Sequence, residues 1–251
     1  MSGPLSDGMK RRSRFDLARR MAVLAEKRLL ADLEGLNSPG RETLQERVYQ
    51  ELKRAMMQGR FAPGSALPLR SVAAAMGTSL MPVREALRQL AAERAVEVLP
   101  NRAFAIPKMT RAILADLGRT RLLIEGEAAR LAAVRQGPRI ADQLIALRDK
   151  ISAATGAHDR AAYRSYNQEF HFCIYSAAGS PVMLHVIETL WLQAGPYLNL
   201  SFSDASGSPI VSQIRHEEAI EAMQKGDGEA ARDAIVADIS DAMEWIMPQL
   251  E

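Results

Sequence analysis

The sequence contains one cysteine in 251 residues, Cys173, so no disulfide can form within the chain. It has no run of 18 or more apolar residues, which argues against a membrane-spanning helix. The first 15 residues include basic side chains but no apolar segment typical of a secretory signal. These absences exclude a disulfide-stapled secreted domain and an integral membrane protein. We therefore expect a cytoplasmic protein.

A strong net charge is also lacking, but the charges are unevenly distributed. The formal net charge is +2, and 47% of the residues are hydrophobic, which is typical of a globular protein with a sizeable core. Residues 41–107 carry ten basic and six acidic side chains, whereas residues 108–251 carry fourteen and nineteen. A basic front part and an acidic back part suggest that one end of the molecule binds a polyanion.

The segment after residue 42 shows helical patterns separated by a loop. Apolar side chains recur on one face of residues 43–58, and Thr43 with Glu46 forms a capping box, so a helix is expected there. Residues 60–70 contain two prolines and a glycine, and they are expected to form a loop. A short second helix is predicted for residues 69–77.

The next segment combines a third helix with an extended hairpin. Ser79 is a good N-cap residue, whose hydroxyl we expect to accept a backbone N–H, and Pro82 lies in the first turn. Residues 95–107 then alternate apolar and polar side chains around a turn at residues 100–102, which predicts a two-stranded hairpin. This order of elements is that of a winged helix-turn-helix, whose third helix presents its N-terminal residues to the DNA major groove.

The segment "LQERVYQELKRAMMQGRFAPGSALPLRSVAAAMGTSLMPVREALRQLAAERAVEVLPNRAFAIP" resembles the DNA-binding domain of the GntR family of bacterial transcription regulators. The remaining chain resembles the all-helical effector domain of the FadR branch, in particular its VanR-like subgroup. The resemblance implies a mainly α fold. A winged helix-turn-helix is expected in residues 43–107, and an antiparallel bundle of about six helices, for ligand binding and dimerisation, in residues 108–251. Residues 1–42 are expected to form an N-terminal extension with one amphipathic helix.

The resemblance also implies which residues contact double-stranded DNA. The family's DNA-contact positions are occupied here by Arg70, Ser79, Arg84, Asn101 and Arg102. Arg84 is expected to read a base, because a bidentate guanidinium on guanine contributes about 1–3 kcal/mol of discrimination. Leu80 stands where many members have arginine, and Leu80 and Met81 are expected to contact thymine methyl groups. The alternative is that Arg70 and Arg84 are surface salt-bridge partners.

Beyond Lys108 the pattern is helical throughout. Helix ends are predicted at Gly137-Pro138, Gly156 and Gly179, and a bend or break near Gly195-Pro196. With two further helices towards the C-terminus, these signals predict six helices packed as a bundle.

Four polar side chains in this bundle predict a divalent metal site. Asn167 and His171 are spaced i,i+4, which places both on one face of a helix. His216 and Asp238 fall at positions where the metal-binding branch of the resembled effector domain supplies ligands. Two imidazoles and a carboxylate with open positions suit zinc, nickel or a similar ion. The alternative is that the two histidines belong to the core and are satisfied by each other and by Asp238.

An effector site is expected beside this metal. The resemblance implies that Arg121 faces the cavity and pairs with an anionic ligand, although a surface arginine is an equal alternative. Aromatic side chains with polar tips are candidates to line an apolar pocket, or else to belong to the core. They are Tyr163, Tyr166, Trp191 and Tyr197.

The sequence therefore predicts a DNA-binding transcription regulator, a repressor rather than an enzyme. We expect a homodimer on a two-fold symmetric operator, controlled by a small carboxylate-bearing effector, an organic acid, at or near the metal. Two alternatives stay open: a metal-dependent enzyme that acts on small organic acids, and a pure metal sensor. An enzyme would have no use for the winged helix.

Overall fold

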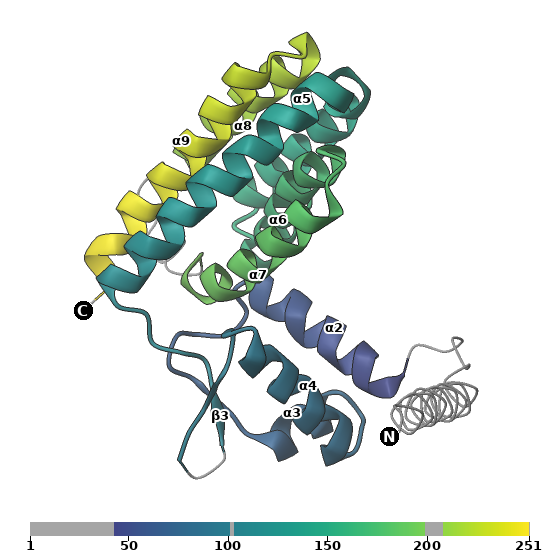
Figure 1. The fold of residues 1–251 in the computed structure, drawn as a ribbon, viewed down its shortest axis with the longest axis vertical. Coiled ribbons are helices and arrows are strands. Elements are labelled where there is room, and N and C mark those ends of the chain that lie inside the picture. Colours follow the sequence, from purple (N-terminus) through teal and green to yellow (C-terminus); the bar gives the residue numbers. More distant parts are fainter. Residues whose placement is uncertain (1–42, 101–102, 199–207, 251) are drawn as a thin grey trace, which may run out of the picture. The chain divides into compact units, whose positions relative to one another are not determined.

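The computed structural model describes residues 43–100, 103–198 and 208–250, and Figure 1 shows its ribbon. The amphipathic helix predicted within residues 1–42 lies outside the described residues, as do the wing-tip residues Asn101 and Arg102. All the helices and strands named below belong to one compact unit, residues 44–251.

Three helices and a small sheet form the N-terminal part of this unit. The elements are α2 (Leu44–Met57), β1 (Ala66–Leu67), α3 (Leu69–Ala75), α4 (Leu80–Ala92), β2 (Glu97–Val98) and β3 (Phe104–Ala105). The apolar faces of α2 and α4 pack together, with Val48, Leu52 and Met56 against the fully buried Val83, Leu87 and Leu90. This order of elements is the predicted winged helix-turn-helix.

The wing differs from the predicted two-stranded hairpin. Ala66 and Leu67, in a segment expected to be a loop, pair with Ala105 and Phe104, so the sheet has three strands in the order β1-β3-β2. The prediction missed β1 because a two-residue strand flanked by Pro68 is too short to show an alternation of apolar and polar side chains.

The helix α4 starts where the sequence predicts, but the predicted capping hydrogen bond is absent. Ser79 has the extended backbone of an N-cap residue, yet its side chain accepts no capping hydrogen bond, so the prediction of a bonded hydroxyl is wrong. An N-cap hydroxyl accepts from the second or third helical N–H. The third residue here is Pro82, which has no N–H to donate, so one of the two possible donors is lost, and the hydroxyl does not bind the other, the N–H of Met81.

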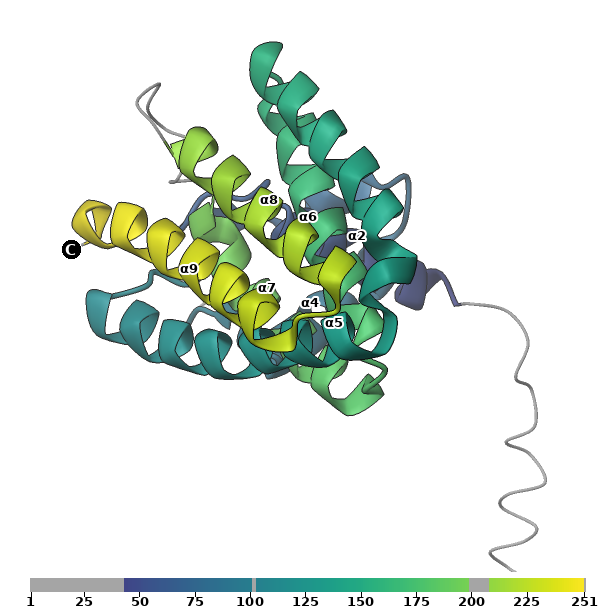
Figure 2. The ribbon, with the colours of Figure 1, turned by 90° about the horizontal axis from the view of Figure 1, so that it is seen from above.

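Five helices form the C-terminal bundle, and Figure 2 shows them from above. They are α5 (Arg111–Gly156), α6 (Arg160–Ala177), α7 (Pro181–Leu198), α8 (Ser208–Lys225) and α9 (Gly228–Ile246), followed by the 3₁₀ helix η2 (Met247–Gln249). Side chains cap the N-terminal ends of α5 and α6, since Thr110 accepts from the Ile113 N–H and Asp159 from two N–H groups. None of the helices in the described ranges is long and apolar enough to cross a membrane.

The predicted helix end at Gly137-Pro138 is wrong. The helix α5 continues through Pro138 to Gly156, so the bundle has five long helices in the described residues instead of six. Proline removes one backbone hydrogen bond and bends a helix without having to end it, and Figure 2 shows α5 changing direction along its length. Gly137 lies so close to α8 that a Cβ there would be 2.4 Å from the Met223 carbonyl oxygen, which indicates that packing against α8 holds the two halves together. Likewise α7 is not broken at Pro196.

Helix α7 contacts both parts of the unit. Its Gly195 lies against α2, where a Cβ would be 2.1 Å from the carbonyl oxygen of Met56. The Lys53 ammonium on α2 forms a half-buried ion pair of 2.7 Å with Glu188 on α7. The DNA-binding part is therefore packed directly on a helix of the bundle.

A strained residue follows α4 and gives a stability prediction. Arg94 has a φ of 61°, a left-handed conformation that costs a residue with a side chain about 1–2 kcal/mol and glycine almost nothing. Glycine also increases the entropy of the unfolded chain, which offsets about 0.4–1 kcal/mol. We expect Arg94→Gly to raise the free energy of unfolding in urea by about 0.5–1 kcal/mol on this balance. Arg94→Ala keeps the strain, and an equal gain from it would contradict this explanation.

Candidate functional site

The N-terminal end of α4 carries side chains that were predicted to contact DNA, of which Arg84 is half-buried and the others are exposed. Leu80 and Met81 are 41% and 65% exposed, which is unusual for apolar residues at a helix start. Arg84 lies one turn further along the same helix, and Arg70 is exposed on α3. Among the described residues neither arginine forms an ion pair, and Glu85 pairs instead with Arg88 at 2.8 Å. The structure thus gives no support to the alternative that Arg70 and Arg84 are surface salt-bridge partners.

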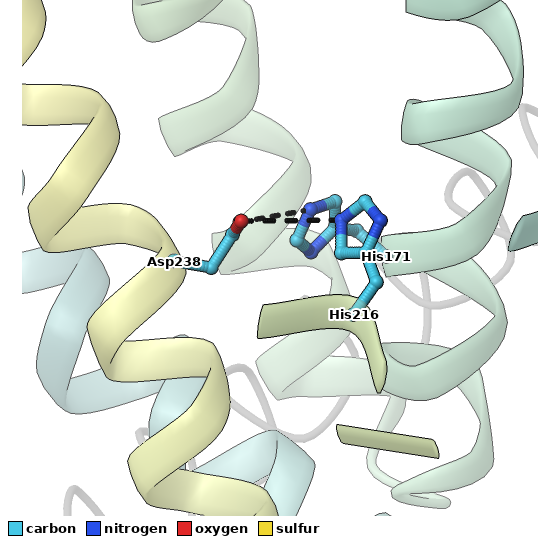
Figure 3. Close-up of side chains that lie close together, drawn as sticks. All are labelled: His171, His216 and Asp238. Atoms are coloured by element: carbon cyan, nitrogen blue, oxygen red, sulfur yellow. Dashed lines mark ion pairs between the residues drawn. The ribbon is translucent and has the colours of Figure 1, made fainter. Parts of the chain in front are cut away.

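A cluster of three titratable side chains is buried inside the bundle. His171 comes from α6, His216 from α8 and Asp238 from α9, and Figure 3 shows the three pointing toward one another. The Asp238 carboxylate lies 3.3 Å from Nε2 of His171 and 3.9 Å from Nε2 of His216. One ligand atom from each residue lies within 4.8 Å of the others. The structure therefore brings together three of the four predicted metal ligands.

The fourth predicted ligand, Asn167, lies one turn before His171 on α6. Its Oδ1 atom is buried and has no hydrogen-bond partner within the part of the chain that the structure describes. The same is true of Nδ1 of His216. A buried polar atom without a partner lowers the stability of the fold, so each of these two atoms is a candidate to bind a group from outside the protein.

Burial and the neighbouring side chains together set the charges in this cluster. Burial alone would raise the pKa of Asp238, but the hydrogen bond and the charge of His171 outweigh it and hold the pKa at about 2. Ser212 also donates a hydrogen bond of 3.0 Å to this carboxylate. Burial lowers the pKa of His216 to about 4, so this imidazole is neutral at physiological pH. A carboxylate beside a neutral imidazole attracts a cation.

A second carboxylate, Glu125 on α5, organises the side chains next to this cluster. It is 0% exposed and accepts hydrogen bonds from Arg121 at 2.6 Å, from the Tyr175 hydroxyl at 2.6 Å and from the Trp191 indole at 2.9 Å. The oxygen of Tyr175 is also 3.2 Å from Nδ1 of His171. Burial raises the pKa of Tyr175 well above its usual value and the charge of Glu125 adds to the shift, so the hydroxyl keeps its hydrogen.

The predicted effector residues are distributed over two places. Arg121 and Trp191 both bind Glu125, so the guanidinium is already paired within the protein. Tyr163 lies beside the cluster, where burial raises its pKa to about 12 and the charge of Asp238 contributes to the shift. Tyr197 is elsewhere, because its hydroxyl donates to the Pro107 carbonyl and its ring lines a cleft of about 700 Å³ between the winged helix and the bundle.

Glu125, Tyr175 and Ser212 were not predicted from the sequence. The sequence held one signal for Glu125, because Arg121 and Glu125 are spaced i,i+4, which makes them neighbours on one face of a helix. Nothing in the sequence shows that Tyr175 and Trp191, from two other helices, meet the same carboxylate.

A winged helix joined to a helical bundle with a buried polar site defines a DNA-binding transcription regulator, and the comparisons with known proteins agree. The family of bacterial regulatory proteins described as the gntR family matches residues 44–106, and the FCD domain matches residues 116–241. The chain belongs to the GntR family, with an FCD domain in its C-terminal part. The family comprises transcription regulators, so the alternative of a metal-dependent enzyme is not retained.

Individual relatives are similar over most of the chain. The HTH-type transcriptional regulator McbR of Escherichia coli (strain K12) is 29% identical over 169 residues, which cover 67% of this chain and 76% of McbR. The HTH-type transcriptional repressor GlaR of the same organism is 28% identical over 153 residues, which cover 59% and 70%. The solved structure of E. coli McbR/YncC superposes with a TM-score of 0.76 at 27% identity, and covers 82% of this chain and 98% of that one.

The buried His216 predicts how the stability of the metal-free protein depends on pH. Its pKa is about 4 in the fold and about 6.5 when exposed, so below pH 6.5 the unfolded chain binds the proton more readily. We expect the free energy of unfolding in urea with EDTA to fall by about 2–3 kcal/mol between pH 7.5 and 4.5 from this group. His216→Gln should lose most of this dependence, whereas His185→Gln, at an exposed position, should keep it. An unchanged pH dependence in His216→Gln would show that another group is responsible.

Proposed function

We propose that this GntR-family protein is a homodimeric repressor whose operator affinity is controlled in the FCD domain by a divalent metal ion and a small carboxylate-bearing effector. The observation that carries the proposal is the buried cluster of His171, His216 and Asp238. The relative GlaR, a repressor by name, supports the sign of regulation. A dimer is proposed because two recognition helices match a two-fold symmetric operator and double the small contact area of one winged helix.

The residues of the cluster fit a divalent ion. Zinc lies about 2.0–2.2 Å from each ligand, so neighbouring ligand atoms in a tetrahedral site are about 3.4 Å apart. In the structure Oδ2 of Asp238 lies 3.3 Å from Nε2 of His171, and Oδ1 lies 3.9 Å from Nε2 of His216. One ligand atom from each residue lies within 4.8 Å of the others, so the three side chains would draw together slightly around an ion. The buried Oδ1 of Asn167, which has no other partner in the described part of the chain, is suited to be a fourth, neutral ligand. Imidazole and carboxylate donors suit zinc or nickel.

When bound, the ion would supply positive charge and open coordination positions for an effector carboxylate. The side chains around the ion would also contribute to binding of the effector. Tyr163 and Trp191 offer apolar faces near the cluster. Arg121 would have to exchange Glu125 for the effector before it could bind an anion, because its Nε and Nη2 atoms both donate to Glu125.

Helix α7 offers a direct route from this site to the DNA-binding part. On one side Trp191 donates to Glu125 next to the cluster, and on the other Gly195 and Glu188 contact α2. A ligand changes operator affinity only if it binds the competent and incompetent states unequally. A ligand that shifts α7 against α5 would meet this condition, because α2 would have to follow.

Metal sensing without an organic effector is a second candidate function. It is favoured by the internal pairing of Arg121 with Glu125, which leaves the predicted anion partner already occupied. In that case DNA affinity would follow metal occupancy alone.

The proposed reading of DNA by Arg84 gives a binding prediction. We expect saturable binding to promoter DNA flanking the gene in a gel-shift assay, and a loss of about 1–3 kcal/mol in Arg84→Ala, because the variant loses a bidentate contact to a base. Arg119→Ala is the matched control, since Arg119 is an exposed arginine on α5. Absence of binding by the wild type, or equal binding by Arg84→Ala, contradicts the proposed contact.

Removal of the metal tests the regulatory proposal. We expect purified protein to bind about one zinc or nickel ion per chain by metal analysis, and Asp238→Asn to bind it much more weakly because the only carboxylate of the cluster is lost. Gel-shifts with EDTA, with metal, and with metal plus a panel of organic acids then separate the two candidate functions. An effect of the acids only on metal-loaded protein supports the effector, and an effect of metal alone supports the sensor. No metal and no response contradicts both.

A further inference from the structure

We propose that Tyr175, held by the buried carboxylate of Glu125, is a positioning residue that fixes His171 with Nδ1 protonated and Nε2 directed at the metal site. The inference rests on the proposed metal site and goes beyond it, because neither Tyr175 nor Glu125 is one of the ligands. It concerns how the protein prepares one imidazole before any ion arrives.

The first step is that Glu125 has no hydrogen to give. It is paired with the Arg121 guanidinium, which donates from Nε at 2.6 Å and from Nη2 at 3.3 Å. Trp191 donates to the same carboxylate at 2.9 Å, and an indole N–H can only donate. Surrounded by these donors and fully buried, the carboxylate acts as an acceptor alone.

The second step follows the single hydrogen of the Tyr175 hydroxyl. It has two neighbours, the Glu125 carboxylate at 2.6 Å and Nδ1 of His171 at 3.2 Å. A short hydrogen bond to an ionised acceptor is about twice as strong as one between neutral groups, so the hydrogen goes to Glu125. The oxygen of Tyr175 is then left as an acceptor, and Nδ1 of His171 must carry the hydrogen that it receives.

The third step concerns the opposite nitrogen of the same ring. Nε2 of His171 faces the Asp238 carboxylate at 3.3 Å, and without metal it donates a hydrogen to that carboxylate. Because Nδ1 keeps its own hydrogen for Tyr175, the Nε2 hydrogen is the one that a divalent ion replaces, since a histidine ligand must offer a lone pair to the ion. Hydrogen bonds of this kind to the second ring nitrogen orient metal-binding histidines.

The two histidines of the cluster differ in this respect. Nδ1 of His216 has no partner in the described residues, and its ring is held by stacking on Phe170 with 4.2 Å between the centroids. The ring nitrogen of His171 that faces away from the cluster is thus held by a hydrogen-bond chain that ends on Glu125, whereas the contacts of His216 are the stacking on Phe170 and the Ser212 hydroxyl, 3.4 Å from Nε2. Loss of the chain should therefore weaken metal binding through His171 specifically.

The test compares zinc affinities of full-length wild-type and Tyr175→Phe protein, measured by competition with a chromophoric chelator. We expect the variant to bind zinc about 10–100-fold more weakly, because an oriented ligand loses its support. Tyr49→Phe is the matched control and should bind zinc like the wild type, because the Tyr49 hydroxyl also donates to a carboxylate, that of Glu93, but lies on α2 outside the site. Circular dichroism and a thermal melt in EDTA check that each variant is folded.

A second readout does not depend on metal. We expect ¹⁵N NMR of histidine-labelled, metal-free wild type at neutral pH to show a hydrogen on Nδ1 of His171, and Tyr175→Phe to lose it. His171→Gln assigns the resonance. The ¹⁵N signal of His171 changes only if the hydrogen-bond chain holds the Nδ1 hydrogen, because a purely structural role of Tyr175 would change the stability of the fold alone.

The outcomes separate this inference from the proposed function. If the wild type binds zinc and Tyr175→Phe binds it equally well and keeps the Nδ1 hydrogen, the inference is wrong while the metal site stands. If the wild type binds no zinc, the proposed metal control fails and the role of Tyr175 toward a metal fails with it. Weaker binding together with loss of the Nδ1 hydrogen supports both.

Discussion

The structure depends on the burial of one carboxylate, Glu125. A charge removed from water is stable only when it is paired and its acceptor positions are filled, because its desolvation costs several kcal/mol, to order of magnitude. Here the donors come from the same helix and from two others: Arg121 on α5, Tyr175 on α6 and Trp191 on α7. The requirement to satisfy this charge fixes the three helices relative to one another. The cluster of His171, His216 and Asp238 lies directly beside that junction.

This arrangement links the site inside the bundle to helix α2 of the winged helix-turn-helix. Trp191 and Gly195 are four residues apart on α7, and they contact Glu125 and the backbone of α2 respectively. Gly195 has no side chain that could deform, so the backbone of α7 packs directly on the backbone of α2. A displacement of α7 at this point would therefore displace α2 as well. A rigid helix between two close contacts is a physical link that both sites can bias.

Much of the fold and part of the site could be predicted from the sequence. The winged helix follows from local signals such as Ser79 and Pro82, and the i,i+4 spacing of Asn167 and His171 does not depend on the rest of the fold. The errors have tertiary causes. Pro138 remains helical because of packing on α8, β1 exists because β3 is beside it, and the partners of Glu125 come from helices far apart in the sequence. Local patterns cannot show such contacts.

The missing cap of α4 bears on how the protein meets DNA. Pro82 in the third helical position removes one of the two backbone donors that the hydroxyl of Ser79 could bind, and the hydroxyl does not bind the other, so the positive N-terminal end of the helix has no side-chain cap. A phosphate group is the natural partner for such an end. The free protein therefore leaves the N-terminal end of α4 without a cap, and a phosphate bound there would complete the helix.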